Sequence, residues 1–192
     1  MSRLVQKVIL LVDSSGSMYG CDIEAVKQSI SKFSKSLYKY DGKHSRVDLQ
    51  IISFSTKARF ISRHNIKSIV AEGTTNLADA YTKLDLIFNK RDLFAFRPIV
   101  VLFCDGKPNT GNHKFALNKL YKHSAFRNSI RIAFAYGEQD SETRKILRDF
   151  TSNAKYMIES LKIDTFNSLL EKTIPKILNR EQYEQKNIKK NY

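Results

Sequence analysis

Small oxygen-bearing side chains directly follow an aliphatic run near the start of the sequence. Asp13, Ser15 and Ser17 occupy alternate positions, and Gly16 between them permits a sharp turn. Alternation allows the three side chains to converge on one point. Carboxylate and hydroxyl oxygens, with no histidine or cysteine among them, suit Mg²⁺ or Mn²⁺. The pattern therefore indicates a site for a hard divalent cation. A zinc site would instead be expected to contain histidine or cysteine ligands.

Two further polar loops could complete such a site. The segment EGTTNLADA places Thr75 at the start of an expected helix, and CDGKPN places Asp105 directly after the most hydrophobic strand. Each feature has an ordinary alternative, since Thr75 or Asn76 could cap the helix and Asp-Gly is common turn chemistry. We interpret them as one site because all three loops occur together in a suitable strand order.

The elements that must position these loops alternate between short apolar runs and amphipathic segments. Strands are expected over residues 7–12, 47–54, 58–62, 98–104, 130–136 and 156–158. Helices are expected from residue 23 to near residues 41–42, over residues 77–88, 115–126 and 141–150, and from Thr165 onward. This order is typical of an α/β, Rossmann-like doubly wound fold: a mostly parallel six-stranded sheet with one antiparallel edge strand and helices on both faces.

The expected strand order also predicts where the loops meet. Residues 8–12 contain no polar side chain and require cover on both faces, which a central strand receives. The turn at residues 55–57 is too short for a parallel return, so residues 58–62 should form the antiparallel edge strand. In open parallel sheets, ligands bind outside the carboxyl ends of the strands. The three polar loops should therefore converge there.

Length and composition predict one domain. The chain has 192 residues, of which 42% are hydrophobic and 11% aromatic. We expect a domain over residues 1–180, a last helix interrupted at Pro175, and a basic, frayed tail over residues 181–192. No apolar run is long enough to span a bilayer, and the N-terminal Met-Ser-Arg-Leu precedes no cleavage site, so no membrane association and a cytoplasmic location are expected.

The cysteines and aromatic residues give further expectations about burial. Cys104 ends an apolar strand and should be buried, whereas Cys21 should be the more accessible thiol, both being reduced. Phe115, Leu120 and Phe126 recur at helical spacing, so we expect them in the core rather than as a stacking surface.

A net charge of +14 predicts an acidic partner. Two blocks carry basic residues and no carboxylate, one over residues 49–71 and the other between Gly106 and Gly137. Because Lys107 directly follows the Asp105 turn, at least one cation should stand near the site. A solvated surface is the plain explanation. An acidic partner protein is favoured over nucleic acid, which stays the alternative.

The joint motif pattern resembles the von Willebrand factor A domain and its metal-ion-dependent adhesion site. The resemblance spans residue 6 to about 178 and rests on three motifs, namely D-x-S-x-S (Asp13, Ser15, Ser17), T-x-L-x-x-A (Thr75, Leu77, Ala80) and a strand ending in D-G (Asp105, Gly106). Thr74 competes with Thr75, but only Thr75 sets Leu77 and Ala80 at the family offsets. The segment SGSMYGCDIEAVKQSI is most similar to compact bacterial intracellular members, including those of the tellurium-resistance type.

The resemblance implies a cation bound through the hydroxyls of Ser15, Ser17 and Thr75, with Asp13 and Asp105 often acting through water. Mostly neutral ligands would leave the cation enough charge to attract an external carboxylate. It further implies a non-enzymatic protein-interaction module, monomeric on its own, with stress-response or phospho-signalling partners.

A metal-dependent hydrolase is a weaker hypothesis. The histidines are scattered, no G-x-S-x-G or phosphate-binding loop occurs, and Glu72 is the only carboxylate in its loop. The sequence therefore lacks the acid-base residues that metal-assisted hydrolysis requires.

Overall fold

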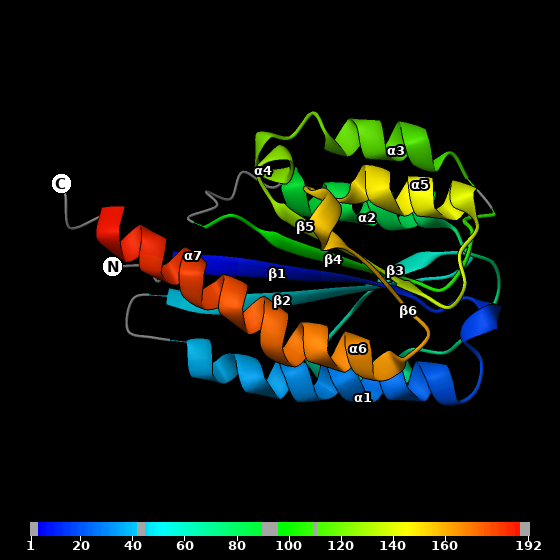
Figure 1. The fold of residues 1–192 in the computed structure, drawn as a ribbon, viewed down its shortest axis with the longest axis horizontal. Helices are drawn as coiled ribbons and strands as arrows, with labels where there is room; N and C mark the ends of the chain where they lie inside the picture. The colour runs from blue at the N-terminus through cyan, green and yellow to red at the C-terminus, as the bar shows by residue number, and fades with distance from the viewer. Residues whose placement is uncertain (1–3, 42–44, 90–95, 110, 189–192) are drawn as a thin grey trace.

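The computed structural model describes residues 4–41, 45–89, 96–109 and 111–188 of the chain (Figure 1). Within these residues the strands are β1 (Leu4–Asp13), β2 (Ser45–Phe54), β3 (Ala58–Ile61), β4 (Ile99–Cys104), β5 (Ile130–Tyr136) and β6 (Met157–Ser160). The α-helices are α1 (Cys21–Ser36), α2 (Leu77–Phe88), α3 (His113–Leu120), α4 (Ser124–Arg127), α5 (Ser141–Phe150), α6 (Ile163–Ser168) and α7 (Ile174–Ile188).

The strands form one sheet in the order β3-β2-β1-β4-β5-β6. All neighbouring pairs are parallel except β2 and β3, which are antiparallel and place β3 at the edge. The central strand β1 pairs with β2 and β4, in a register that sets Val12 opposite Phe103. The predicted fold class, the central first strand and the antiparallel edge strand are therefore confirmed.

Helices cover both faces of the sheet, as Figure 1 shows, with α1, α6 and α7 on one side and α2 to α5 on the other. Because strand side chains alternate, Val8 and Leu10 of β1 join the core beneath α1, whereas Ile9 and Leu11 join the core beneath α2. Both cores are fully buried along β1, which explains why its sequence carries no polar residue between Val8 and Val12.

The segment expected as one helix over residues 115–126 is two helices. α3 ends at Leu120, a turn follows, and α4 begins at Ser124. Leu120 and Phe126 are buried as predicted, but Phe115 is 70% exposed, so its assignment to the core is wrong. Phe115 and Leu120 both belong to α3, but residues five apart do not share a face of a helix, so the face that buries Ala116, Leu117 and Leu120 leaves Phe115 on the outer side.

The C-terminal region is interrupted before Pro175, as predicted. A π-helical turn over residues 169–173 separates α6 from α7, and Pro175 is the second residue of α7. The Ile174 N–H donates to the Leu169 carbonyl in this turn, so the change from π to α pattern coincides with Pro175, which has no N–H to continue the helical ladder. α7 continues to Ile188, and residues 189–192 of the expected tail lie outside the described residues. The boundary at residue 180 stays a prediction.

Cys104 is fully buried, as predicted. Cys21 is the first residue of α1 rather than part of the preceding loop, and its thiol lies outside the described side chains. Across the described ranges, no helix is long and apolar enough to cross a membrane.

Candidate metal site

The three polar loops meet at the carboxyl ends of β1 and β4, on the right of Figure 1. Asp13 is the last residue of β1, and Cys104 is the last residue of the neighbouring β4. The parallel register brings these two ends together, so the loop that starts with Ser14 faces the loop that starts with Asp105. The third loop, residues 72–76, leads into α2.

Ser15 of the first loop lies between Ser17 of the same loop and the aspartate of the second loop. The Ser15 hydroxyl lies 3.0 Å from the Ser17 hydroxyl and 3.5 Å from Oδ1 of Asp105. Ser15 and Asp13 are buried, Asp105 is partly buried, and Ser17 is exposed. The cluster therefore opens to solvent on the Ser17 side, which leaves a direction from which a ligand can approach.

Asp13 is a fully buried carboxylate held by two protein donors. Its Oδ1 accepts the Ser15 backbone N–H at 2.9 Å, and its Oδ2 accepts the Cys104 thiol at 3.1 Å. Burial first, and then the negative charge of Asp105, raise the pKa of Asp13 from 3.8 to about 7. Burial and the charge of Asp13 also raise the pKa of Cys104, which keeps the thiol protonated and able to donate. A positive charge at this position would relieve the repulsion.

Thr75 and Thr74 differ in their contacts. The Thr74 hydroxyl lies 3.3 Å from that of Thr56, to which the Thr74 backbone N–H also donates. Thr75 is buried. Asn76 caps α2 by accepting the Asp79 N–H, so the ordinary alternative of Thr75 as the helix cap does not hold. These contacts favour Thr75 over Thr74 as a ligand residue.

Asn109 fixes Thr75 to the loop that carries Asp105. Its side-chain oxygen accepts the Thr75 N–H at 3.0 Å, and its own N–H donates to the Thr75 carbonyl at 3.2 Å. This reciprocal pair joins two loops that are 34 residues apart in the sequence. The motif spacing does not single out Asn109; its position four residues after Asp105 in CDGKPN is the only sequence signal for it.

Glycines allow the first and third loops to approach at backbone distance. The Gly16 N–H donates to the Gly73 carbonyl at 3.0 Å, and the Glu72 N–H donates to the Ser14 carbonyl at 2.9 Å. Gly73 has a φ of +71°, and a Cβ atom there would lie 2.3 Å from Oγ1 of Thr56. A larger residue at position 73 would strain the backbone and force Thr56 to shift, a constraint that motif spacing did not reveal.

The donors present fit a hard divalent cation. The cluster offers serine hydroxyls and carboxylates, with the buried Asp13 adding negative charge behind the hydroxyls. Among the described residues, no group of three or more His, Cys, Asp and Glu side chains could hold a metal ion. Any cation here would thus depend on hydroxyl ligands, in line with what the family resemblance implies for Ser15, Ser17 and Thr75.

Lys107 stands near the site, but its charge is paired. Its ammonium group contacts the carboxylate of Glu142, and this hydrogen bond raises the pKa of Lys107. Lys107 is therefore a less effective attractor of acidic partners than its position in the sequence implied.

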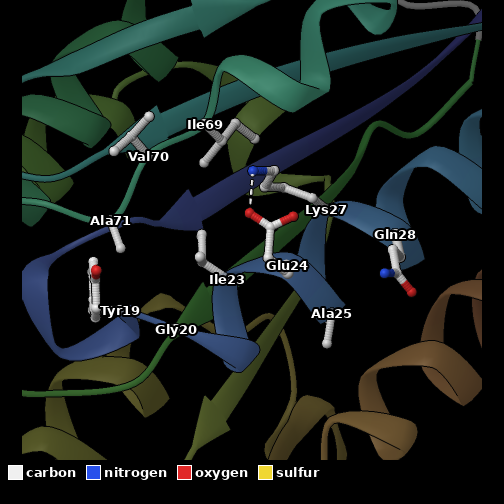
Figure 2. Close-up of a pocket in the computed structure, with 10 residues that line it drawn as sticks. All are labelled: Tyr19, Gly20, Ile23, Glu24, Ala25, Lys27, Gln28, Ile69, Val70 and Ala71. Atoms are coloured by element: carbon white, nitrogen blue, oxygen red, sulfur yellow. Dashed lines mark hydrogen bonds and ion pairs between the residues drawn. The ribbon is translucent and has the colours of Figure 1, made fainter.

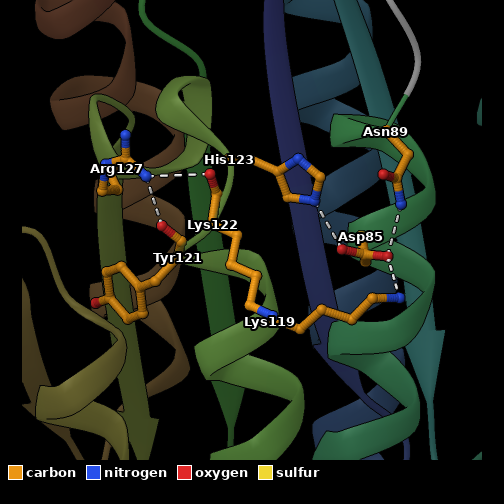
Figure 3. A network of polar contacts seen from close by, with 7 residues as sticks. All are labelled: Asp85, Asn89, Lys119, Tyr121, Lys122, His123 and Arg127. Carbon is orange, nitrogen blue, oxygen red and sulfur yellow. Dashed lines mark hydrogen bonds and ion pairs between the residues drawn. The ribbon is translucent and has the colours of Figure 1, made fainter.

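Other basic side chains of the block between Gly106 and Gly137, and His123 among them in the sequence, also make contacts within the fold. Figure 3 shows Lys119 and His123 on the buried carboxylate of Asp85, each at 2.8 Å. Burial alone would raise the pKa of Asp85, but the hydrogen bonds from Lys119 and His123 lower it. Arg131 is buried and donates to the carbonyls of Phe126 and Phe150. Much of this positive charge is thus committed to internal contacts.

Comparison with known proteins identifies the family to which this chain belongs. Residues 8–107, just over half of the chain, match the model of the von Willebrand factor type A domain. The chain therefore belongs to the von Willebrand factor type A domain family. A comparison with curated protein sequences gives no significant match.

Solved structures with the same fold come from diverse sources. The von Willebrand factor domain of Mfa5, a type V pili tip protein from Porphyromonas gingivalis, has a TM-score of 0.74 at 10% identity, covering 94% of this chain and 97% of that one. VWA2, an ArnB paralog from Sulfolobus acidocaldarius, has a TM-score of 0.65 at 21% identity, covering 88% and 45%.

A third similar structure holds a metal. Proximal thread matrix protein 1 from the mussel byssus was solved with zinc in its metal-ion-dependent adhesion site (MIDAS) motif. It has a TM-score of 0.64 at 19% identity, and the match covers 88% of this chain. The present chain spans about half the length of the mussel and archaeal proteins. At these identities the similarity shows the fold alone.

Proposed function

We propose that this chain is a non-enzymatic protein-interaction module that binds a carboxylate of an acidic partner protein through a divalent cation. Domains of this family typically mediate protein–protein interactions. The hydroxyls of Ser15, Ser17 and Thr75 would hold the cation, and Asp13 and Asp105 would act mainly through water. Mg²⁺ or Mn²⁺ is the expected ion, and the cytoplasmic location stays a prediction.

One observation supports this proposal most strongly. The Ser15 hydroxyl lies within 3.5 Å of both Ser17 and Asp105, in a cluster whose buried side carries the Asp13 carboxylate. One Asp13 oxygen accepts a hydrogen bond from the Ser15 N–H and the other accepts one from the Cys104 thiol. This arrangement suits a carboxylate that interacts with the cation through water. A cation held chiefly by neutral hydroxyls keeps most of its charge and attracts an external carboxylate.

Nucleic-acid binding is the second candidate, favoured by the exposure of Phe115. This aromatic ring lies on α3 beside the exposed side chain of Lys114. Base stacking on an exposed ring is worth about 1–3 kcal/mol, but single-strand binding requires several rings along a basic groove. Phe126 is buried in the same region and Arg131 is held by carbonyls, so we favour the protein partner.

Metal dependence and salt dependence separate the two functions. A pull-down from cell lysate should retain specific proteins with Mg²⁺ and lose them with EDTA. The Thr75→Ala variant, even in Mg²⁺, should fail to retain the proteins that the wild type loses in EDTA. Retention of nucleic acid that ignores EDTA but falls steeply with salt would favour the second candidate and contradict the first.

Asn109→Ala should weaken ion binding without removing a ligand. The substitution removes the acceptor of the Thr75 N–H, so Thr75 loses one of the two hydrogen bonds that fix it to the opposite loop. Residues that orient metal ligands typically change affinity by about 10- to 100-fold. We expect a tenfold weaker Mg²⁺ affinity by calorimetry. Asn153→Ala, which removes a turn contact to Lys155 at a distance from the site, is the control and should leave the affinity unchanged.

The proposed role of exposed lysines gives a contrasting expectation. Replacing Lys107 and Lys114 together by alanine should weaken partner association and flatten its salt dependence while leaving ion affinity unchanged. Because Lys107 is paired with Glu142, most of this effect should come from Lys114. Association rates of the two single variants, measured at low and high salt, test the assignment. Equal effects of the two lysines would contradict it.

A further inference from the structure

A groove lies next to the candidate metal site, between the start of α1 and the segment Ile69–Ala71. It has a volume of about 640 Å³, and its lining is mainly apolar (Figure 2). Ile23, Ile69 and Ala71 form buried parts of the lining. In Figure 2, Tyr19 and Ala71 lie at one end of the groove and Gln28 lies at the other.

Two side chains of this groove are unusually exposed for their type. Tyr19 is 83% exposed and Val70 is 54% exposed. Scattered apolar residues are ordinary on protein surfaces, but an aromatic and an aliphatic side chain beside an apolar groove form a contiguous feature. Tyrosine is also enriched among the residues that dominate binding energy at interfaces. These features indicate a surface that a partner covers.

The groove and the candidate metal site share one backbone framework. Tyr19 follows Ser17 by two residues, so their Cα atoms are at most about 7 Å apart. Its N–H donates to the Gly16 carbonyl at 3.1 Å. On the other wall, Ala71 immediately precedes Glu72, whose N–H donates to Ser14. A chain segment that reaches the site with a carboxylate can therefore place its neighbouring side chains on Tyr19 and Val70.

The charges around the groove favour an acidic segment with an apolar side chain at its centre. The acidic and basic residues of the lining, Glu24 and Lys27, pair with each other at 2.6 Å, which leaves the groove itself without net charge. Beside it, the Arg59 guanidinium donates to the carbonyl of Ser68, and Lys67 is exposed. An apolar side chain thus suits the groove, while acidic residues suit the border next to Lys67 rather than the border next to the exposed Glu72.

We propose that the partner segment is an acidic peptide stretch of another protein in which an Asp or Glu is followed or preceded, within three positions, by a large apolar residue. The carboxylate occupies the metal-dependent site, and the apolar side chain packs between Tyr19 and Val70. This inference rests on the proposed function, because it assigns the partner chemistry of the same site.

Selection from a random library tests the sequence preference directly. Ten-residue peptides displayed on phage are selected on the immobilised full chain in Mg²⁺ and eluted with EDTA. The expected peptides carry Asp or Glu with an aliphatic or aromatic residue within three positions. Selection on the Tyr19→Ser variant should retain the acidic residue and lose the apolar preference.

Affinities of one labelled selected peptide, measured by fluorescence polarisation, complete the test. Tyr19→Ser and Val70→Ser should each weaken binding by about fivefold to tenfold, the loss expected for partial exposure of one apolar side chain. Tyr19→Phe should bind like the wild type. Phe115→Ser is the matched control, because it removes another largely exposed aromatic residue, from the opposite helical layer, and it should have no effect.

The outcomes distinguish a failure of the groove proposal from a failure of the proposed metal-dependent function. Peptides with an acidic residue but no neighbouring apolar residue, or unchanged binding by Tyr19→Ser, overturn the groove proposal and leave the proposed function standing. The lack of any EDTA-eluted peptide overturns both. A dimer in sedimentation that disappears in Tyr19→Ser would show that a second copy of the chain fills the groove, which also contradicts the proposal.

Discussion

Replacing Asp13 by asparagine should stabilise the metal-free protein at pH 8 by up to about 4 kcal/mol. The pKa of Asp13 is about 7 in the folded chain and 3.8 ordinarily, and each unit of difference corresponds to about 1.4 kcal/mol. Because the folded pKa is the higher one, the unfolded chain loses this proton first. The cost of the buried charge therefore grows from about pH 4 to pH 7 and is complete above pH 7. Asparagine keeps the acceptor for the Ser15 N–H and removes the charge.

Urea unfolding in EDTA at several pH values measures this effect. The difference between Asp13→Asn and wild type should be large at pH 8 and should shrink towards pH 4. Glu171→Gln, which neutralises an exposed carboxylate, should change stability by less than about 0.5 kcal/mol at every pH. An Asp13→Asn protein less stable than wild type at pH 8 would show that the hydrogen bonds of Asp13 outweigh its charge.

Phe103→Ala should cost about 3–5 kcal/mol of unfolding free energy, typical of truncating a buried phenylalanine. Phe103 is fully buried in β4, and its ring lies 5.6 Å from that of Phe134 and 4.8 Å from that of Phe166. The substitution therefore opens a cavity between the sheet and α6. It also loosens the strand whose next residues are Cys104 and Asp105.

Urea unfolding at a fixed pH measures this loss. Phe115→Ala is the control, since its ring is largely exposed, and its cost should stay below about 0.5 kcal/mol. A loss below 1 kcal/mol for Phe103→Ala would mean that the core around α6 collapses to fill the space, contrary to the close ring packing.

The positions of the central and edge strands could be predicted from the sequence because the features that determine them are local. The apolar run of β1 requires cover on both faces, and the short turn after Phe54 excludes a parallel return, so both the central and the edge strand followed from the residues alone. The register then brings Asp13 and Asp105 to the same sheet end. The motifs could therefore be assigned to one place before any contact was known.

Features that depend on tertiary contacts were not predictable. Whether Asn76 or Thr75 caps α2 depends on side-chain direction, which spacing does not determine. The contact of the Cys104 thiol with Asp13 requires the register of two strands 91 residues apart. Phe115 was misassigned because it lies five residues before Leu120 in α3, a spacing that does not place two side chains on one face of a helix. The pairing of Lys107 with Glu142 likewise joins distant segments.

Calorimetry of Mg²⁺ and Mn²⁺ binding to the wild type, Ser17→Ala and Ser14→Ala tests most directly whether the chain holds a divalent cation at the proposed site. The Ser17 hydroxyl is a proposed ligand, 3.0 Å from that of Ser15, whereas the Ser14 hydroxyl is turned to Ser53 at 2.7 Å. The wild type should bind one ion, Ser14→Ala should bind it with similar affinity, and Ser17→Ala should bind at least tenfold more weakly. Unchanged ion affinity in Ser17→Ala, or no ion binding by the wild type, would contradict the metal-dependent function and leave the fold unaffected.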